Sequence, residues 1–318
     1  MSILRRGISI SIVTFNTWER TAECISSLLE HCRGSEFEIL VHDNGISQVS
    51  APFNSTRVQL MSSPTNVGFG AGHNANLCRA QFDTFLILNP DVTLTDAVIL
   101  ALRDAVQVPE VSAASPILVF PDGTEQLSFR KFPNVYTEMA RVVGRDHRPD
   151  SKWSTLVRVQ PDTGLVDVDQ PAGAALAVRT QLLRNLRGFD ESYLMYFEDV
   201  DLCTRLSANG RIVALSDVHI FHDGEGTAKS YRTATTFWIE YSRRNYHSKN
   251  ASGAMRIFLL ALCALSCATH LVVCGLQSAV GSLSNRLESS TKARGYAYAL
   301  LSLLWRKEST WKRKFLTQ

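Results

Sequence analysis

Short apolar runs alternate with segments of helical spacing over the first 120 residues, and this alternation constrains the fold more than any other feature. The apolar runs predict strands over residues 8–14, 37–41, 58–61 and 85–88, and the segments between them predict helices over residues 21–32, from the glycine-rich segment to residue 80, and from 96 to 106. Helices between successive strands imply a mostly parallel sheet covered by helices. We therefore expect an α/β fold with a Rossmann-like central sheet.

Regular patterns are weaker in the second half of the chain. Residues 126–169 are rich in Arg, Pro and Asp, and we interpret them as an irregular insertion. A helix is predicted from about Glu198 to Gly210, because glycine is favoured just after a helix end. A strand over residues 211–215 and a further helix over residues 233–246 are expected to follow.

The C-terminal region differs in composition from the rest of the chain. Residues 257–280 contain no charged side chain in 24 positions, a length that could span a bilayer. From Tyr241 onward the net charge is +10, whereas the first 240 residues carry −7. We expect a membrane-associating helix with Arg256 and later basic residues at anionic headgroups, and the sequence leaves open whether it crosses the membrane or lies on it. A buried or partner-facing helix is the alternative interpretation.

These patterns divide the chain into a domain over residues 1–247 and a helical, basic and apolar region over residues 248–318. The seven cysteines form no CxxC pair, which is typical of a reducing compartment, and the N-terminus lacks the small-residue cleavage site of a signal peptide. We expect a cytoplasmic protein at the inner face of the cell membrane. The apolar neighbour of the basic tail favours a membrane surface over nucleic acid as its partner.

Polar residues follow three of the predicted strands, at Asn16, Asp43 and Asp91. In an open α/β sheet, ligands bind beyond the carboxyl ends of the strands, so these side chains could face one crevice. Carboxylates placed beside a phosphate ligand indicate a bridging hard cation, Mg²⁺ or Mn²⁺. The alternative for either aspartate alone is helix capping or turn formation.

The segment NVGFGAGHN, residues 66–74, places three glycines between a strand and a helix. Glycine lets the backbone approach a ligand, and a helix N-terminus favours phosphate. The spacing matches neither the dinucleotide fingerprint GxGxxG nor the P-loop, so both of these readings are excluded.

The segment YFEDVDLCTR offers the best candidate for a reactive acid. On a helix, Asp199 and Asp201 point in roughly opposite directions, and Asp201 can pair with Arg205 four residues later. This leaves Asp199 free for chemistry, although Glu198 and Asp199 could simply complement the helix dipole. Further on, a strand leads into a glycine-bearing loop at His222, a metal-ligand type of residue.

Seven motifs occur in a recognisable order: SIVTFN, VHDNG, NVGFGAGHN, LNPDV, GFDE, YFEDVDLCTR and HIFHDGEGT. Together they resemble family 2 glycosyltransferases of the GT-A fold, specifically the rhamnosyltransferase-like branch, over residues 8–247. The resemblance implies a nucleotide-diphospho-sugar donor and a metal. It also implies a cell-surface polysaccharide as the product.

The resemblance assigns roles to individual positions. It implies contacts with the donor nucleotide and sugar from Thr14, Phe15, Asn16, Asp43, Asn66, Gly68, Phe69, Gly70 and Asn89. Asp91 and His222 correspond to metal ligands, and Asp199 to the catalytic base. We also expect acceptor contacts from Gly173, Ala174 and Glu198. Two positions depart from the pattern: Asn89 replaces the first carboxylate of the metal motif, and His73 stands where the branch commonly has Asn.

The expected activity is inverting transfer of a sugar, with rhamnose suggested by the branch, to a hydroxyl of a glycan or lipid-linked glycan. The donor is dTDP-rhamnose or a UDP-sugar, with GDP-sugars also open. One alternative is a non-catalytic, membrane-associated subunit that binds a nucleotide sugar or acts as a scaffold. Another is a nucleotidyltransferase on a related sheet.

Overall fold

The computed structural model describes residues 4–45, 53, 55–145, 149, 151–160, 164–224, 231–280 and 282–304. The chain forms two compact units. We call the first the sheet unit; it comprises Met1–Phe132, Leu156–Leu194 and Glu198–Gly224. We call the second the helical unit; it comprises Pro133–Thr155, Met195–Phe197 and Glu225–Gln318.

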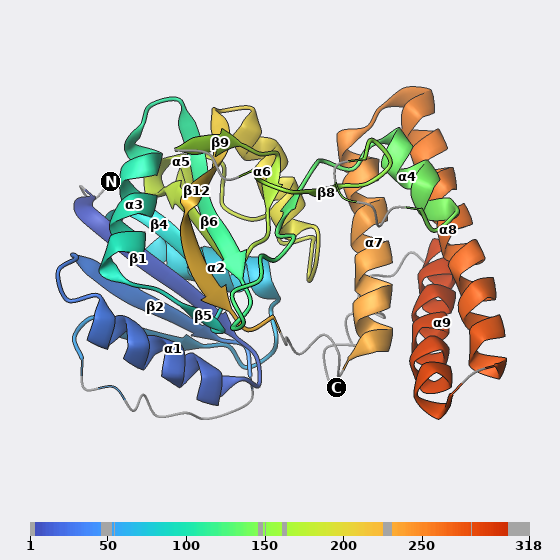
Figure 1. The fold of residues 1–318 in the computed structure, drawn as a ribbon, viewed down its shortest axis with the longest axis horizontal. Coiled ribbons are helices and arrows are strands. Elements are labelled where there is room, and N and C mark those ends of the chain that lie inside the picture. Colours follow the sequence, from blue (N-terminus) through green and yellow to red (C-terminus); the bar gives the residue numbers. More distant parts are fainter. Residues whose placement is uncertain are drawn as a thin grey trace. The chain divides into compact units, whose positions relative to one another are not determined.

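A large mixed sheet organises the sheet unit (Figure 1). Its order is β3-β2-β1-β4-β11-β6-β12-β5, with β9 paired to β12. The strands are β1 (Arg5–Thr14), β2 (Phe37–Asp43), β3 (Val58–Ser62), β4 (Phe82–Leu88), β5 (Val92–Thr93), β6 (Val111–Val119), β9 (Leu165–Asp167), β11 (Ala175–Arg179) and β12 (Arg211–His222). The pairs from β3 to β4 and the β6–β12 pair are parallel, whereas β11 runs antiparallel to both neighbours. The predicted α/β class with a mostly parallel sheet is confirmed.

Helices cover both faces of this sheet. On one face, α1 (Trp18–His31) and α3 (Asp96–Gln107) share a core with the inward side chains of β1, β2 and β4. The opposite face is covered by α2 (Phe69–Arg79), α5 (Thr180–Asn185) and α6 (Glu198–Ser207). Burial on both faces explains the continuous apolar runs of the central strands, which sequence reasoning used to find them.

The predicted elements differ from the observed ones mainly around the insertion. Strand β6 was missed, although all of its residues are buried. Residues 126–169 contain β9 and three further short elements: β7 (Phe129–Arg130), α4 (Val135–Val142) and β8 (Leu156–Val157). β7 pairs with β8 and with β10 (Gln170–Pro171) in a small second sheet. Because these strands are two or three residues long, they leave no periodic pattern in the sequence.

The helical unit contains α4, α7 (Arg232–Asn250), α8 (Gly253–Ala279) and α9 (Leu283–Leu304). The boundary predicted after residue 247 falls three residues before the end of α7. All of α7 belongs to the same compact unit as α8 and α9. The functional division at that boundary stays a prediction. Of the helices in the described part of the chain, α8 is the one long and apolar enough to cross a membrane.

Candidate functional site

Asp91 and His222 lie together at the edge of the sheet, although 130 positions separate them. β4 ends at Leu88, the chain turns through Asp91, and β5 then pairs antiparallel with the end of β12, with His222 opposite Val92. This pairing places His222 Nε2 3.4 Å from Asp91 Oδ1. The structure therefore brings the two predicted metal ligands to one point, while their role stays a prediction.

A glutamine fixes the orientation of the His222 ring. Gln126 Nε2 donates to the backbone carbonyl of His222 at 2.7 Å, so the amide oxygen of Gln126 faces the ring, with Oε1 2.8 Å from His222 Nδ1. An amide oxygen accepts only, so Nδ1 carries the hydrogen and Nε2 presents its lone pair toward Asp91 in the neutral ring. A histidine held in this way by its second nitrogen is ready to bind a metal.

The Asp91 carboxylate is suited to hold a divalent cation. Burial raises its pKa, but the adjacent His222 side chain and the charge of Arg20 outweigh burial and hold the pKa below its ordinary value. Among the described residues, Asp91 Oδ1 is buried without a hydrogen-bond partner. A carboxylate oxygen and an imidazole nitrogen face each other at this distance. The carboxylate oxygen suits both Mg²⁺ and Mn²⁺, whereas the imidazole nitrogen suits Mn²⁺ better. These residues fit the predicted metal.

Asp199 is the second residue of α6, and two hydrogen bonds hold its carboxylate. Its Oδ1 accepts from the Val200 backbone N–H at 2.8 Å, and its Oδ2 accepts from Gln170 Nε2 at 3.1 Å. Burial raises the pKa of Asp199, and the Val200 N–H, the charge of Arg130 and the Gln170 hydrogen bond counteract only part of this effect. A carboxylate with a raised pKa accepts a proton more readily.

The environment of Asp199 includes the predicted acceptor and donor segments. A Cβ added to Gly173 would lie 3.7 Å from the Asp199 Cβ and 3.9 Å from the Phe69 ring, so the three residues meet. The predicted pair of Asp201 and Arg205 is confirmed, with Arg205 Nε 2.8 Å from Asp201 Oδ2. Of the two aspartates on this helix, Asp199 is therefore the one without an arginine at salt-bridge distance among the described contacts.

Glu198, which was predicted to contact the acceptor, is buried next to Asp199 and has fewer hydrogen-bond partners than Asp199 among the described residues. Burial, followed by the charge of Asp199, raises the pKa of Glu198 to about 8, and its Oε2 has no hydrogen-bond partner among the described residues. The two preceding residues, Tyr196 and Phe197, have φ angles of 64° and 66°. Side chains other than glycine rarely adopt this region, and such strain clusters at functional sites. Burial thus favours the protonated, uncharged form of Glu198.

One backbone hydrogen bond connects the Asp91 loop to the surroundings of Asp199. β11 pairs antiparallel with β4, with Ala175 opposite Leu88, and the Asn89 N–H donates to the Ala174 carbonyl at 2.9 Å. The next residue toward the N-terminus, Gly173, lies against Asp199. Asn89, Ala174 and Gly173 thus lie between the two acids at one edge of the sheet, although the described contacts include none between the acids themselves.

The predicted nucleotide-binding residues gather where β1 and β2 end. Thr14 pairs with Asp43 in the parallel register, and Asp43 Oδ1 accepts from the Gly45 N–H at 2.8 Å. Asn44, which sequence reasoning missed, donates from Nδ2 to the Gly68 carbonyl at 3.0 Å. Asn16 lies beside Gly45 with a φ of 55°, and Phe15 is partly buried. Asn44 therefore ties the ends of these strands to the glycine loop.

The glycines of residues 66–74 are explained by packing against the protein. Gly68 has a φ of 96°, and a Cβ there would lie 2.6 Å from the Leu194 carbonyl oxygen. A Cβ on Gly70 would approach Phe189 within 2.8 Å, and one on Gly72 would approach Val13 equally closely. Close approach to a ligand is thus not the only reason for glycine at these positions. Asn66 Oδ1 accepts from the Gly68 N–H at 2.9 Å and shapes the loop.

His73 lies in the interior. Its Nδ1 is 2.7 Å from Ser11 Oγ, the residue is fully buried, and its ring contacts that of Phe69. Burial, followed by the charge of His42, lowers the pKa of His73 to about 3, so the ring is neutral. A buried, hydrogen-bonded imidazole supports the position of the loop above it.

Gln126, Gln170 and Arg130 contribute to the site, and sequence reasoning missed all three. Gln126 and Arg130 fall within the segment interpreted as an irregular insertion, and Gln170 directly follows it. Arg130 pairs with Gln170 across β7 and β10, and this pairing sets both near Asp199. No local motif marks them, because Gln126 acts through contacts with His222, 96 positions away, and Arg130 and Gln170 act through the pairing of two-residue strands.

Solved structures share this architecture. The mannosyltransferase PcManGT from Pyrobaculum calidifontis, solved with GDP-Man and Mn²⁺, superimposes with a TM-score of 0.51 and 15% identity over 96% of this chain and 89% of that chain. S. aureus TarS 1-349 in complex with UDP-GlcNAc gives a TM-score of 0.52 at 15% identity over 94% and 91%. The fold is that of the GT-A glycosyltransferases, as the sequence predicted.

The sequence comparisons agree with the predicted resemblance. Residues 9–160 match Glycosyl transferase family 2. The Rhamnosyltransferase WbbL of Escherichia coli is 29% identical over 67% of this chain and 84% of its own length. The N-acetylglucosaminyl-diphospho-decaprenol L-rhamnosyltransferase of Mycobacterium tuberculosis is 29% identical over 54% of this chain and 61% of its own length. The match thus spans about three fifths of the mycobacterial protein. The sequence comparisons therefore bear out the resemblance to family 2 glycosyltransferases, with rhamnosyltransferases among the similar proteins.

Proposed function

We propose that this protein is an inverting glycosyltransferase that moves a sugar from a nucleotide-diphospho-sugar to a hydroxyl of a glycan or lipid-linked glycan in cell-surface polysaccharide synthesis. The observation that carries the proposal is the position of Asp199. It is a hydrogen-bonded carboxylate of raised pKa beside Gly173 and the glycine-loop residue Phe69. The family 2 match and the rhamnosyltransferase relatives support this chemistry.

In the proposed reaction, Asp199 removes the proton from the acceptor hydroxyl as its oxygen bonds to the anomeric carbon of the sugar. The bond between that carbon and the diphosphate oxygen breaks, and the nucleoside diphosphate leaves with the bonding electrons. Attack from the opposite face inverts the configuration. General-base catalysis of this kind contributes roughly 10²–10⁴ in rate. The Gln170 hydrogen bond holds the Asp199 carboxylate in one orientation during the transfer.

Asp91 and His222 are proposed to hold Mg²⁺ or Mn²⁺ beside the donor diphosphate. A bound divalent cation neutralises charge on a leaving diphosphate. The buried Asp91 Oδ1 without a hydrogen-bond partner and the adjacent Nε2 of His222 support this role. Asn89 supplies no charge, so Asp91 is the main protein anchor. The Mn²⁺ in the PcManGT structure is consistent with this proposal at the level of the fold.

Donor contacts are proposed for Thr14, Phe15, Asn16, Asp43, Asn66, Gly68, Phe69, Gly70 and Asn89. Gly173, Ala174 and Glu198 are proposed for the acceptor. The names of the similar rhamnosyltransferases favour rhamnose as the transferred sugar. The proposed donor is dTDP-rhamnose, with UDP-sugars as the alternative. The apolar helix α8 and the basic tail are proposed to keep the protein at the cytoplasmic face of the membrane, where a lipid-linked acceptor would be available.

Thermal-shift screening of the purified full chain against nucleotide sugars, with and without Mn²⁺, tests the donor and the metal together. A ligand that binds only the folded state raises the melting temperature. We expect the largest shift with one nucleotide sugar in the presence of Mn²⁺. A transfer assay on the same sugar should then release nucleoside diphosphate. Release of pyrophosphate instead would identify a nucleotidyltransferase, and donor binding without turnover would favour a non-catalytic subunit.

A further inference from the structure

The distribution of side chains on α8 is inverted relative to a helix that faces water. Its outward residues are large and apolar: Ile257, Phe258, Leu265, Val272, Val273 and Leu276, with exposed fractions from 45% to 72%. We call this set the apolar face. The residues buried against the rest of the helical unit are mostly small or polar, and they include Cys263, Ser266, Cys267 and Cys274. Helices on water show the opposite arrangement, so the medium outside α8 is apolar.

A buried ionic cluster lies against the middle of α8. We define it as Glu138 on α4 together with Glu240, Arg243 and His247 on α7. Glu138 Oε1 is 3.0 Å from His247 Nε2, and its Oε2 is 3.5 Å from Arg243 Nη1. Glu240 pairs with Arg243, and all four residues are buried. Charges removed from water in this way are retained only when they are paired.

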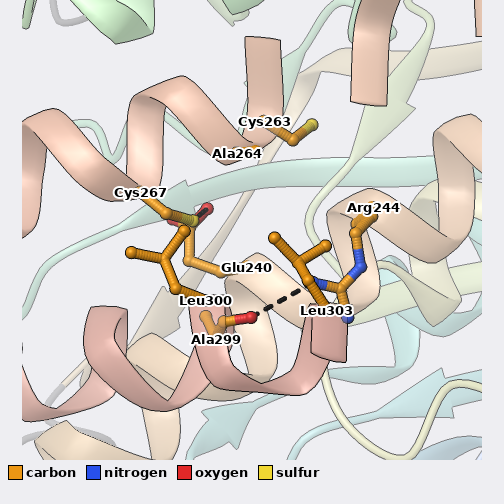
Figure 2. Close-up of a pocket in the computed structure, with 8 residues that line it drawn as sticks. All are labelled: Glu240, Arg244, Cys263, Ala264, Cys267, Ala299, Leu300 and Leu303. Atoms are coloured by element: carbon orange, nitrogen blue, oxygen red, sulfur yellow. Dashed lines mark hydrogen bonds between the residues drawn. The ribbon is translucent and has the colours of Figure 1, made fainter. Parts of the chain in front are cut away.

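The α8 cysteines face this ionic cluster. Cys267 Sγ lies 3.2 Å from Glu240 Oε2, and Cys263 Sγ lies 3.9 Å from Glu138 Oε2. Figure 2 shows Cys267 beside Glu240, and Arg244 directed at the Ala299 carbonyl. The uncharged middle of α8 is therefore in contact with charged groups on its inner side.

The ligand types in this cluster resemble a metal site, but its charges argue against one. Glu138, His247 and Cys263 offer ligand atoms within 4.8 Å of one another. Arg243 already lies against Glu138, and both Arg141 and Arg243 pair with Glu240. A divalent cation at Glu138 would be repelled by guanidinium groups in a medium of low dielectric. The cluster therefore serves to position the helices.

After α8 the chain turns back, and α9 packs against α7. α9 returns alongside α7, where the Thr233 hydroxyl donates to the Thr291 carbonyl at 3.0 Å and Arg244 donates to the Ala299 carbonyl at 3.2 Å. A Cβ on Gly295 would lie 2.5 Å from Thr236, so the two backbones are closely packed. α9 and α7 thus flank α8 on its inner side within one unit.

These contacts exclude a crossing helix. At about 1.5 Å per residue α8 is roughly 40 Å long, and the hydrocarbon core is about 30 Å thick. If α8 crossed, the neighbouring α7 and α9 would lie at the same depth. The Arg232–Glu288 pair, the ionic cluster and Arg244 would then sit in hydrocarbon. Charged groups at that depth cost free energy. This cost is avoided when only the outer side of α8 contacts lipid.

The net positive charge of residues 251–304 favours an anionic lipid surface. Residues 251–304 carry Arg256, Arg286, Lys292 and Arg294 against the single acid Glu288. Arg256 lies in the first turns of α8 beside the exposed Ile257, and Arg286 and Arg294 are exposed on α9. Basic residues that border an apolar helix face are attracted to anionic headgroups.

We propose that α8 lies in the plane of an anionic membrane surface, with its apolar face in the lipid and the ionic cluster on the protein side, and does not cross the bilayer. This inference rests on the membrane association included in the proposed function. It adds the orientation: α7, α9 and the ends of α8 all stay on one side of the membrane. The apolar face is the part of the protein that enters the lipid.

The first test measures binding of the full chain to vesicles by co-sedimentation. Vesicles of phosphatidylethanolamine with phosphatidylglycerol should bind the protein more tightly than vesicles of phosphatidylcholine. The double substitution Leu265→Glu with Val272→Glu should lower the partition coefficient roughly a hundredfold, because each loses the burial of an aliphatic side chain. Val108→Glu, an exposed valine of the sheet unit, is the matched control and should bind normally. Unchanged binding by the double variant would overturn the proposal.

The second test determines topology in a bacterial host. Green fluorescent protein or alkaline phosphatase is inserted into the full chain between α8 and α9, the point that would lie across the membrane if α8 crossed. An in-plane α8 keeps both fusions in the cytoplasm, so the first fluoresces and the second stays inactive. An active phosphatase fusion would show that α8 crosses the membrane and would overturn the proposal.

Two further measurements separate the remaining outcomes. If the apolar face binds a second copy of the chain instead, the wild type is a dimer in solution and the double variant is a monomer with unchanged vesicle binding, which would overturn the proposal. Donor-induced thermal shifts of the double variant should equal those of the wild type and thereby also show that it is folded. Loss of vesicle binding with retained donor binding therefore reports on α8 alone, whereas absence of donor binding in the wild type would count against the proposed transferase.

Discussion

The sheet unit and the helical unit distribute polar and apolar groups in opposite ways. In the sheet unit, large apolar side chains fill the layers between sheet and helices, and the acids Asp91 and Asp199 lie at the sheet edge. In the helical unit, Glu138, Glu240 and Arg243 are buried while Leu265 and Val272 are exposed. The exposed apolar side chains of the helical unit are those that the proposed contact of α8 with lipid would cover.

The same comparison separates two uses of buried carboxylates. Asp199 has hydrogen-bond donors but no arginine at salt-bridge distance among its described contacts, and its pKa is raised, which suits a base. Glu138 and Glu240 are paired with arginines, which suits a structural role. The predictions below test whether this division holds.

The largest effect is expected from Asp199→Asn. The amide cannot accept the hydroxyl proton, so transfer should fall by roughly 10²–10⁴ while donor-induced thermal shifts persist. Steady-state release of nucleoside diphosphate measures the change. Asp201→Asn, on the same helix but paired with Arg205, is the control and should retain most activity. Near-normal turnover in Asp199→Asn would remove the base assignment.

Arg243→Met tests the structural use of buried charge. It leaves Glu138 and Glu240 without their shared partner, and breaking a buried pair costs about 3–5 kcal/mol. Urea unfolding of the full chain, followed separately for the two units, should show the loss in the helical unit. Arg103→Met breaks the surface pair with Asp104 and should cost about 0–1 kcal/mol. Equal effects of both variants would contradict the role of the cluster.

Asp91→Asn should weaken the response to Mn²⁺. Replacement of the charged ligand removes the main protein anchor, and we expect a loss of metal affinity of at least roughly tenfold, by analogy with the 10–100-fold loss when a supporting partner of a metal ligand is removed. The readout is the Mn²⁺ titration of the donor-induced thermal shift. His219→Gln changes an exposed histidine on β12, the strand that carries His222, and should leave the titration unaltered. A titration of Asp91→Asn that matched the wild type would place the metal elsewhere.

Glu198→Gln should change the pH dependence of stability. The folded-state pKa of Glu198, raised by burial to about 8, exceeds its ordinary value of 4.5, so the folded protein binds the extra proton between these values. Stability therefore falls as pH rises through that window, and the glutamine variant should show a flatter curve. We expect the melting temperature of the wild type to fall relative to that of the variant as the pH rises across the window, by roughly 2–4 °C for each kcal/mol of stability lost. Parallel curves would show that Glu198 ionises normally in the folded chain.

The sequence predicted the elements whose signals are local. The apolar runs of β1, β2 and β4 and the helical spacing of α1 and α3 were found because burial on fixed faces imposes a period on the chain. The Asp201–Arg205 pair followed from helix geometry alone. Strand β6 was missed, although it is entirely buried and reads as an apolar run with small residues.

The site was only partly predictable, because some of its residues lie in local motifs and others act only through contacts with distant segments. Asp91, His222 and Asp199 carry motifs, so their chemistry could be named from the sequence. Gln126 and Gln170 could not be found, because they act through pairing with residues 96 and 29 positions away. Glycine-loop positions were recognised, but their contacts with Leu194 and Phe189 became visible only in three dimensions.

The sequence by itself determined the α/β class, the family resemblance and the uncharged length of α8, because each depends on composition or on short-range order. Tertiary structure alone decided which side of α8 faces outward, which buried acids form ion pairs with arginines, and how Asp91 and His222 meet. These properties depend on contacts between distant segments, and a linear pattern cannot specify them, because burial and desolvation are set by everything that packs around a group.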